Sequence, residues 1–243
     1  MKRTIDLLRA FHDGRAEYTL TELATSLHLN KTAVHRLLGV LEEADFVVRN
    51  PDTGAYRLGP EMIMLGATAL RSNDLRTAGH AELSALAREA EESATLEVLV
   101  GTDVVIVDEV AGPHVLSPAG ETGTRWPAHA TSTGKVLLAW REALPKSLRL
   151  TALTPNTITS RARLDKELVQ VRRRGYAAAL EELEVGFVAV AAPVRDHDGR
   201  VVAAIGIGGP GRRISRTRIV SMSRLVTASA DRASTNLGWK KRG

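Results

Sequence analysis

The chain has 243 residues, a formal net charge of +5 and a pI of about 9.8. It contains no cysteine, which excludes disulfide bonds, thiolate chemistry and cysteine-ligated zinc or iron–sulfur sites, and which fits a reducing cytoplasm. No apolar run approaches the ~18 residues of a membrane span, and the N-terminus lacks the apolar core of a signal peptide. We therefore expect a cytoplasmic protein with no membrane partner.

A basic pI suggests an anionic partner, but the charge is unevenly distributed. Residues 1–75 contain nine Lys or Arg and ten Asp or Glu, so this region has a net charge of −1 and the remainder carries +6. Any binding of nucleic acid by the N-terminal region must depend on the local placement of a few basic side chains, because a domain-wide positive field is missing.

Residues 19–28 predict a short helix that ends in a tight turn. Thr19 and Glu22 have the spacing of a capping box, so the helix starts near Leu20. His28 stands where a helix-turn-helix usually has glycine. A positive φ is uncommon for other residues, although histidine is one of the enriched exceptions. The apolar residues that recur on one face of this helix are Leu20, Leu23, Ala24 and Leu27.

A second helix follows the turn and carries the candidate DNA contacts. Asn30 is a good N-cap for it. The inner, apolar stripe consists of Val34, Leu37, Leu38 and Leu41. The predicted contacts to a double-stranded DNA operator are Asn30, Lys31, Thr32, Ala33, His35 and Arg36. They occupy the end of a recognition helix that meets base edges and phosphates in the major groove. The alternative interpretation is a solvated helix face with ordinary surface charges.

A turn-bearing hairpin then completes a winged helix-turn-helix. Phe46–Val48 predicts a strand, Asn50–Gly54 has turn chemistry, and Tyr56–Leu58 returns. Arg49 and Arg57 flank the turn and are predicted to contact phosphate or the minor groove; a plain hairpin packed on the helices is the alternative. A first helix, close enough to the chain start that no long N-terminal arm is expected, contributes Ile5, Leu7, Leu8 and Phe11 to the core.

The remaining chain alternates helices with β-rich runs, which predicts an α+β fold with helices flanking a mostly antiparallel sheet. The expected helices are a linker from Pro60 to about Asn73, then Leu75–Ser93, Ser132–Trp140, Leu164–Arg174 and Ser215–Leu237. The expected strands are Thr95–Val100, Val104–Val110, Val185–Val194 and Val201–Gly208, with a loop starting at Trp126–Ala130. We expect three parts: a DNA-binding domain at 1–59, a linker helix at 60–74 and a sensor-like domain at 75–243.

Two motif-like strings point to enzymes but lack their companions. Gly206–Gly211 matches G-x-G-x-x-G, yet a dinucleotide fold needs a βαβ unit and no strand is expected after the closing helix. Ser132 and Lys135 form the S-x-x-K of penicillin-recognising serine enzymes, but neither S-D-N nor K-T-G occurs. We predict no catalytic residue and no cofactor; a hydrolase using Ser132 and Lys135 is the rival from another class.

Metal sites and acid–base pairs find little support. None of the seven histidines pairs with another at the i, i+2 or i, i+4 spacing of a metal site, so no metal is predicted. Glu181, Glu182 and Glu184 are typical of a solvated loop. Glu97 interrupts an apolar strand and either lines a cavity or lies on the wet face of the sheet. The helix start at Ser132–Gly134 presents free backbone N–H groups, which favour an anion such as a carboxylate.

The chain resembles transcriptional regulators of the isocitrate lyase regulator (IclR) family almost from end to end. The matching runs are LNKTAVHRLLGVLEEADFV, TGAYRLG, RWPAHATSTGKVLLA, TITS, VRRRGYAAALEELEVGFVAVAAPVRD and the Gly-Gly-Pro turn. The resemblance implies an N-terminal DNA-binding domain, a linker helix and a GAF-like effector domain. It also implies homodimers, or dimers of dimers, on partly palindromic operators.

The resemblance further implies an effector site. In members that bind small carboxylates, two backbone amides hold the ligand, at positions that match Ser132 and Thr133. An acid, a cysteine and two serines that those members add are here Ala179 or Leu180, Ala189, Gly206 and Gly208. A site without these polar groups rejects analogues poorly, so we expect a larger, more apolar effector with one polar or acidic group at the Ser132/Thr133 end. Further wall candidates are Glu97, Arg125, Trp126, His129 and Gly134. A domain that has lost its effector and only mediates assembly is the alternative.

Overall fold

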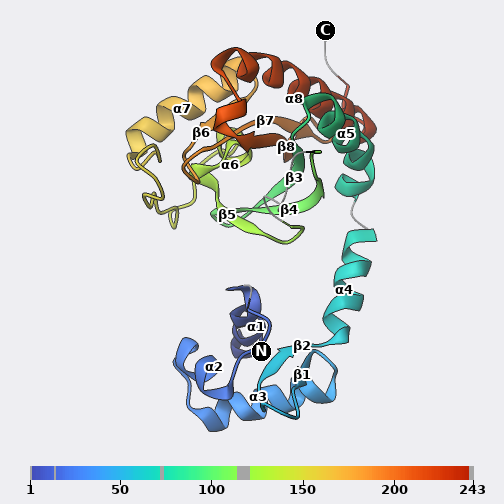
Figure 1. The fold of residues 1–243 in the computed structure, drawn as a ribbon, viewed down its shortest axis with the longest axis vertical. Coiled ribbons are helices and arrows are strands. Elements are labelled where there is room, and N and C mark those ends of the chain that lie inside the picture. Colours follow the sequence, from blue (N-terminus) through green and yellow to red (C-terminus); the bar gives the residue numbers. More distant parts are fainter. Residues whose placement is uncertain (1, 14, 72–73, 114–120, 241–243) are drawn as a thin grey trace. The chain divides into compact units, whose positions relative to one another are not determined.

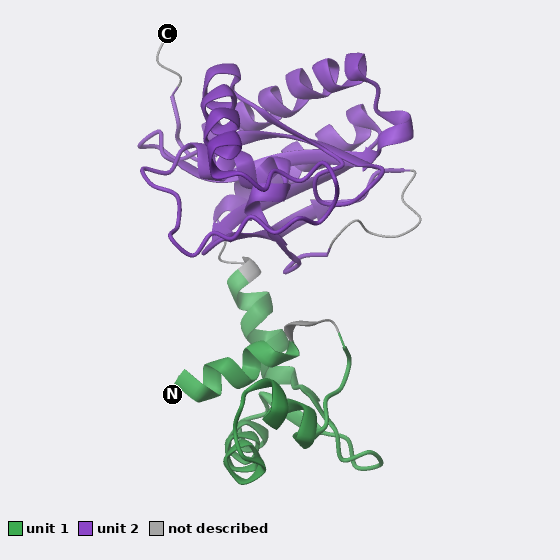
Figure 2. Cartoon of the chain, turned by 90° about the vertical axis from the view of Figure 1, so that its left-hand side faces the viewer, with its two compact units in different colours: residues 1–72 green, residues 73–243 purple. Residues whose placement is uncertain are grey.

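The structure is a computed structural model that describes residues 2–13, 15–71, 74–113 and 121–240. Contacts divide the chain into two compact units, residues 1–72 and 73–243 (Figures 1 and 2). The helix expected as a linker belongs by its contacts to the first unit. None of the helices in the described ranges combines the length and apolar character that crossing a membrane requires.

The first unit is a winged helix-turn-helix. Its helices are α1 (Lys2–Arg9), α2 (Leu20–Ser26), α3 (Lys31–Glu43) and α4 (Pro60–Arg71), and a 3₁₀ turn, η1 (Ala10–Asp13), follows α1. The wing is the antiparallel pair β1 (Val47–Arg49) and β2 (Tyr56–Leu58). Its core contains Leu7, Phe11, Leu23, Val34 and Leu38, so the predicted motif is present. Ile5 is 45% exposed and does not belong to that core, contrary to expectation.

Local chemistry explains the boundaries of α2 and α3. The predicted capping box is formed, because the Thr19 side chain accepts from the Glu22 amide and Glu22 accepts from the Thr19 amide. The turn between the helices places His28 at φ 53°, in the left-handed region that glycine usually supplies. Asn30 then caps α3 by accepting from the Ala33 amide at 2.7 Å. The turn of the helix-turn-helix therefore forms with histidine in place of the usual glycine.

The second unit is built on one six-stranded antiparallel sheet in the order β5-β4-β3-β8-β7-β6. The strands are β3 (Ser93–Val100), β4 (Asp103–Val110), β5 (Arg125–Pro127), β6 (Ala177–Leu180), β7 (Phe187–Arg195) and β8 (Val201–Pro210). Its helices are α5 (Asp74–Ala90), α6 (Ser132–Ala139), α7 (Arg161–Arg174) and α8 (Arg216–Asn236), with 3₁₀ turns η2 (Ala128–Ala130) and η3 (Gly211–Arg213). The predicted α+β class with a mostly antiparallel sheet is confirmed.

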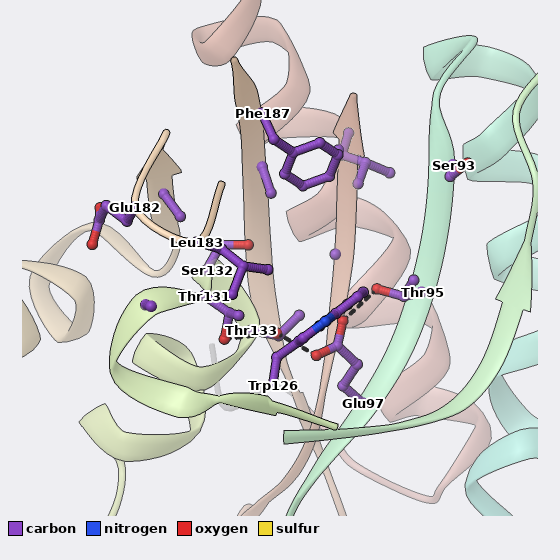
Figure 3. A pocket seen from close by; sticks show the side chains of 16 residues that line it. Ser93, Thr95, Glu97, Trp126, Thr131, Ser132, Thr133, Glu182, Leu183 and Phe187 are labelled. Atoms are coloured by element: carbon purple, nitrogen blue, oxygen red, sulfur yellow. Dashed lines mark hydrogen bonds between the residues drawn. The ribbon is translucent and has the colours of Figure 1, made fainter. Parts of the chain in front are cut away.

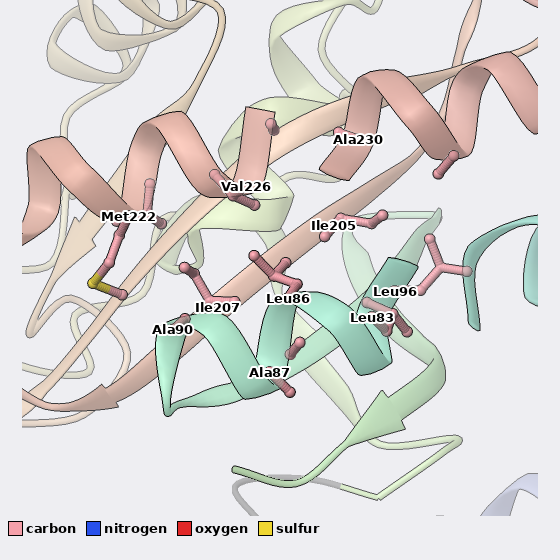
Figure 4. Close-up of a cluster of buried hydrophobic side chains, with 14 of the residues drawn as sticks. Leu83, Leu86, Ala87, Ala90, Leu96, Ile205, Ile207, Met222, Val226 and Ala230 are labelled. Carbon is pink, nitrogen blue, oxygen red and sulfur yellow. The ribbon is translucent and has the colours of Figure 1, made fainter. Parts of the chain in front are cut away.

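Strand alternation sends side chains to two separate cores. On β8, Ile205 and Ile207 join the cluster that packs under α5 and α8 (Figure 4), whereas Ala204 packs under α6 and α7. Gly206 and Gly208 share the α6 side with Ala204, because residues two apart face the same way. The sheet thereby leaves a strip of small residues opposite the beginning of α6.

Several sequence-based assignments need correction; for example, α7 begins at Arg161 and not at Leu164. α5 ends at Ala90 instead of Ser93, because Glu91 adopts φ 53° and β3 begins at Ser93. Trp126 lies in the short strand β5, which pairs with β4, and not in a loop. Strand β6 was not predicted, since its four residues (Ala177–Leu180) have no polar alternation to distinguish a strand from a turn.

Candidate functional site

The exposed end of α3 carries the predicted DNA-reading residues. Lys31, Thr32, His35 and Arg36 are exposed, and Ala33 is half-buried. The opposite face of the helix is fixed in the core by Val34, Leu38 and Leu41. Asn30 is also exposed, but its side-chain oxygen is occupied by the capping bond to the Ala33 amide. A recognition helix needs this arrangement of one anchored face and one free basic face.

The wing is organised by Asn50, for which the sequence predicts only a place in the turn. The side-chain oxygen of Asn50 accepts from the amides of Asp52 and Thr53, and its amide group donates to Glu17. Arg49 pairs with Tyr56 across the hairpin and holds its guanidinium 5.9 Å from that ring. Exposed Arg57 pairs with Val48, so both arginines are placed on the hairpin as predicted.

A cavity lies between the beginning of α6 and the strip of small residues on the sheet (Figure 3). The space free of protein atoms, which includes solvent at the open mouth, is about 540 Å³, and the volume open to the centres of water-sized spheres is about 50 Å³. In Figure 3 the rings of Phe187 and Trp126 lie on opposite sides of this space. The lining is Ser93, Thr95, Glu97, Trp126, Ala130, Thr131, Ser132, Thr133, Ala179, Glu182, Leu183, Phe187, Ala189, Gly206, Ile207 and Gly208.

The first turn of α6 includes Ser132 and Thr133, which line the cavity. Thr131 is the N-cap, and its hydroxyl accepts from the Gly134 amide at 3.0 Å. The Lys135 amide makes the first helical bond, to the Thr131 carbonyl. The amides of Ser132 and Thr133 precede that bond and have no acceptor within the helix. Two N–H groups at the positive end of a helix favour an anion.

Glu97 lines the cavity and is 3% exposed, which settles the two interpretations in favour of the cavity wall. Its carboxyl oxygens accept from the hydroxyls of Thr133 at 2.6 Å and Thr95 at 2.7 Å (Figure 3). Burial raises the pKa of Glu97, and the two hydroxyl hydrogen bonds oppose this rise only in part.

Glu182 is the second acid in the wall, and the solvated-loop interpretation of it is wrong. It is 8% exposed and pairs with the buried ammonium of Lys135 at 2.5 Å. Lys135 also donates to the Ala178 carbonyl at 2.6 Å. Burial raises the pKa of Glu182, opposed by the charge of Lys135. In Figure 3 the carboxyl of Glu182 points away from Glu97 and Thr133. The ion pair of Glu182 with Lys135 therefore connects this part of the cavity wall to α6.

The structure brings together most of the residues predicted for the effector site. Eight of them line the cavity: Glu97, Trp126, Ser132, Thr133, Ala179, Ala189, Gly206 and Gly208. His129 and Gly134 are not in the lining. His129 is buried and bonds through Nε2 to the Thr151 carbonyl at 3.0 Å, and Gly134 packs against the backbone of Ala128. Leu180, the alternative to Ala179, is 44% exposed, and Arg125 is exposed on β5.

Two glycines of the wall have no room for a side chain. A Cβ at Gly208 would come within 2.7 Å of the Phe187 ring, and one at Gly206 within 2.9 Å of the Thr133 methyl group. The aromatic ring and the methyl group therefore occupy space that larger residues would take. Phe187 was missed from the sequence because it starts a strand whose register with β8 is set only by folding.

The comparisons with known proteins agree with both halves of this geometry. The family model of the IclR helix-turn-helix domain matches residues 1–51, and that of the bacterial transcriptional regulator IclR C-terminal domain matches residues 67–235. The chain belongs to the IclR family of transcriptional regulators. Family membership accounts for a helix-turn-helix domain followed by a second domain, and it agrees with a transcriptional regulator that is not an enzyme.

Individual relatives span nearly the whole chain. The HTH-type transcriptional regulator XynR of Escherichia coli is 30% identical over 98% of this chain and 97% of its own length. The glycerol operon regulatory protein of Streptomyces coelicolor is 34% identical over 89% and 86%. An IclR homolog of Microbacterium hydrocarbonoxydans, solved in complex with 4-hydroxybenzoate, is 25% identical over 97% of each chain, with a TM-score of 0.81.

Proposed function

We propose that this IclR-family regulator binds its operator through α3 and the wing, and that an apolar or aromatic acid in the cavity modulates this binding. The carrying observation is the cavity that joins two free amides of α6 to a wall of Trp126, Phe187 and small residues. The 4-hydroxybenzoate complex of the Microbacterium homolog supports an aromatic acid as the type of ligand. An effector shifts DNA binding only if it binds the two functional states with different affinity.

We also propose that the regulator works as a homodimer or a dimer of dimers. Helix α4 carries three large apolar side chains that are exposed in the single chain: Ile63 is 74%, Met64 57% and Leu65 47% exposed. These residues are consecutive and point to different sides of the helix, so α4 exposes apolar surface on more than one side, which favours contact with a protein partner. A second copy would place two recognition helices on a partly palindromic operator.

Removing two basic side chains from α3 tests the DNA-reading surface. We expect Lys31→Ala with Arg36→Ala to weaken operator binding ~10- to 100-fold, which corresponds to a loss of about 1.4–2.8 kcal/mol for the two contacts together. Mobility shift with a fragment of the neighbouring promoter measures it. The charge-matched control is Lys2→Ala with Arg9→Ala, on the exposed face of α1. A folded α3 variant that binds as tightly as the wild type contradicts the assignment.

Removing one amide donor from α6 tests the anion site. Ser132 is the first residue of the helix, where proline is well tolerated, and the preceding Thr131 is extended at φ −113° and ψ 153°. Ser132→Pro deletes the N–H, whereas Ser132→Ala deletes only the hydroxyl. We expect the proline variant to bind an acidic ligand ~10- to 100-fold more weakly, since a hydrogen bond to a charged group is worth about 1.5–3 kcal/mol. The alanine variant should bind normally.

The ligand for this comparison comes from a thermal-shift screen of aromatic and aliphatic acids, including 4-hydroxybenzoate. Stabilisation by glyoxylate or pyruvate, and by no larger compound, would contradict the apolar effector. Operator binding that no metabolite alters would favour a second domain that only mediates assembly. The hydrolase rival requires turnover that Ser132→Ala abolishes, but the ammonium of Lys135 is already held by Glu182 and the Ala178 carbonyl.

A further inference from the structure

The cavity contains one buried acid that forms no ion pair with a described basic residue. Glu97 is 3% exposed, and its described partners are two neutral hydroxyls. No Lys, Arg or His of the described residues forms an ion pair with it, and the lining contains no basic side chain. The other acid of the lining, Glu182, is matched by Lys135. Buried carboxylates are normally paired, because leaving one unpaired in a low dielectric is costly.

The surroundings of Glu97 add negative charge. Glu109, on the neighbouring strand β4, has its own pKa raised by burial and by the charges of Glu121 and Glu97. A simple carboxylate effector on the α6 amides would disfavour the ionised form of Glu97 further, whereas a positive group on the ligand would favour it. The wall is thus better matched to a ligand that also carries a positive group.

Thr133 places the two polar subsites side by side. Its backbone amide lies in the first turn of α6, where it has no acceptor within the helix. Its hydroxyl, only a few bonds away, donates to Glu97 at 2.6 Å. A ligand that contacts both the amides and Glu97 needs an anionic and a cationic group attached to the same carbon atom. The rest of such a ligand would face Trp126, Phe187 and Ala189, which are apolar and suit a hydrocarbon side chain.

From this arrangement we infer that the effector is an α-amino acid with an apolar side chain. Its carboxylate accepts from the Ser132 and Thr133 amides, and its ammonium donates to Glu97. The inference rests on the proposed effector site, and it specifies that the apolar acid bound there is a zwitterion. Glu97 is then a specificity-determining residue, which selects amino acids over the corresponding deaminated acids.

Two matched ligand series test the inference on the wild-type protein by calorimetry. One consists of L-phenylalanine, 3-phenylpropanoate and 2-phenylethylamine; the other of L-leucine, 4-methylpentanoate and 3-methylbutylamine. Within a series the apolar body is constant, and only the ammonium or the carboxylate is removed. We expect at least one amino acid to bind at least tenfold more tightly than either of its partial analogues, because only the zwitterion satisfies both subsites.

Glu97→Gln adds a second readout. The amide keeps the shape and accepts or donates to the same hydroxyls, so we expect normal folding, ~10-fold weaker binding of the amino acid, and unchanged or tighter binding of the deaminated acid. Glu109→Gln removes a nearby acid outside the lining and should preserve the preference. The Ser132→Pro change should weaken the binding of the amino acid and of the deaminated acid to the same extent.

The outcomes separate this inference from the proposed function. If the deaminated acid binds the wild type as tightly as the amino acid, the zwitterion is wrong and the acidic effector stands. If the amine binds more tightly than both the amino acid and the deaminated acid, the inference and the proposal of an acidic effector are both wrong. If no compound of either series binds, the inference is also wrong, and the wider screen of acids then decides the proposed function on its own.

Discussion

Lys135→Ala is expected to lower the free energy of unfolding of the second unit by about 3–5 kcal/mol, the usual cost of breaking a buried ion pair by removing one partner. The Lys135 side chain is 1% exposed, and that of Glu182 is 9% exposed. Its removal leaves a carboxylate and the Ala178 carbonyl without their donor. The apolar stem of the lysine is lost from the core as well.

Tryptophan fluorescence during urea unfolding measures this effect selectively, because all three tryptophans (Trp126, Trp140 and Trp239) lie in the second unit. The control is Lys166→Ala, an exposed lysine of α7, whose loss should change stability by no more than about 0.5 kcal/mol. A cost below about 1 kcal/mol for Lys135→Ala would show that the pair contributes little.

Combining the change with neutralisation of Glu182 separates charge from packing. Lys135→Met with Glu182→Gln removes both charges and keeps most of the volume, so we expect it to be more stable than Lys135→Met alone. Because Glu182 lines the cavity and Lys135 belongs to α6, the single variant should also loosen the wall of the effector site. A double variant as unstable as the single one would assign the loss to packing instead of charge.

The DNA-binding half was predictable because its signals are local. The capping box of Thr19 and Glu22 and the N-cap Asn30 are each set within a few residues, and the structure forms both. His28, the expected irregularity, takes the positive φ that the turn requires. What escaped prediction there was the role of Asn50, because its partner Glu17 is 33 residues away.

The cavity was less predictable because its walls come from strands paired over long distances. The strip of Ala189, Gly206 and Gly208 was found through the family resemblance, and the start of α6 through its helical signal. The pairing of Lys135 with Glu182, 47 residues apart, has no local signal. His129 was misplaced for a related reason, since only folding shows that its ring turns toward the Thr151 carbonyl and away from the cavity.

Gly134, predicted to contact the effector, instead sets how closely α6 approaches η2. A Cβ at this position would overlap the carbonyl oxygen and Cα of Ala128, and Ala128 is fully buried. Neither partner is the flexible end of a side chain, so α6 or η2 must move to admit a methyl group. Overpacking of this kind costs about 1–3 kcal/mol and sometimes more.

We therefore expect Gly134→Ala to destabilise the second unit by about 3 kcal/mol, followed by tryptophan fluorescence, and to shift the amides of Ser132 and Thr133 from the cavity. The control is Gly39→Ala in α3, where a Cβ meets no atom within 4 Å and alanine favours the helix. That control should leave the fluorescence transition in place. If the Gly134→Ala protein kept wild-type stability and lost only ligand binding, Gly134 would contact the effector directly, because a direct contact affects affinity without affecting folding.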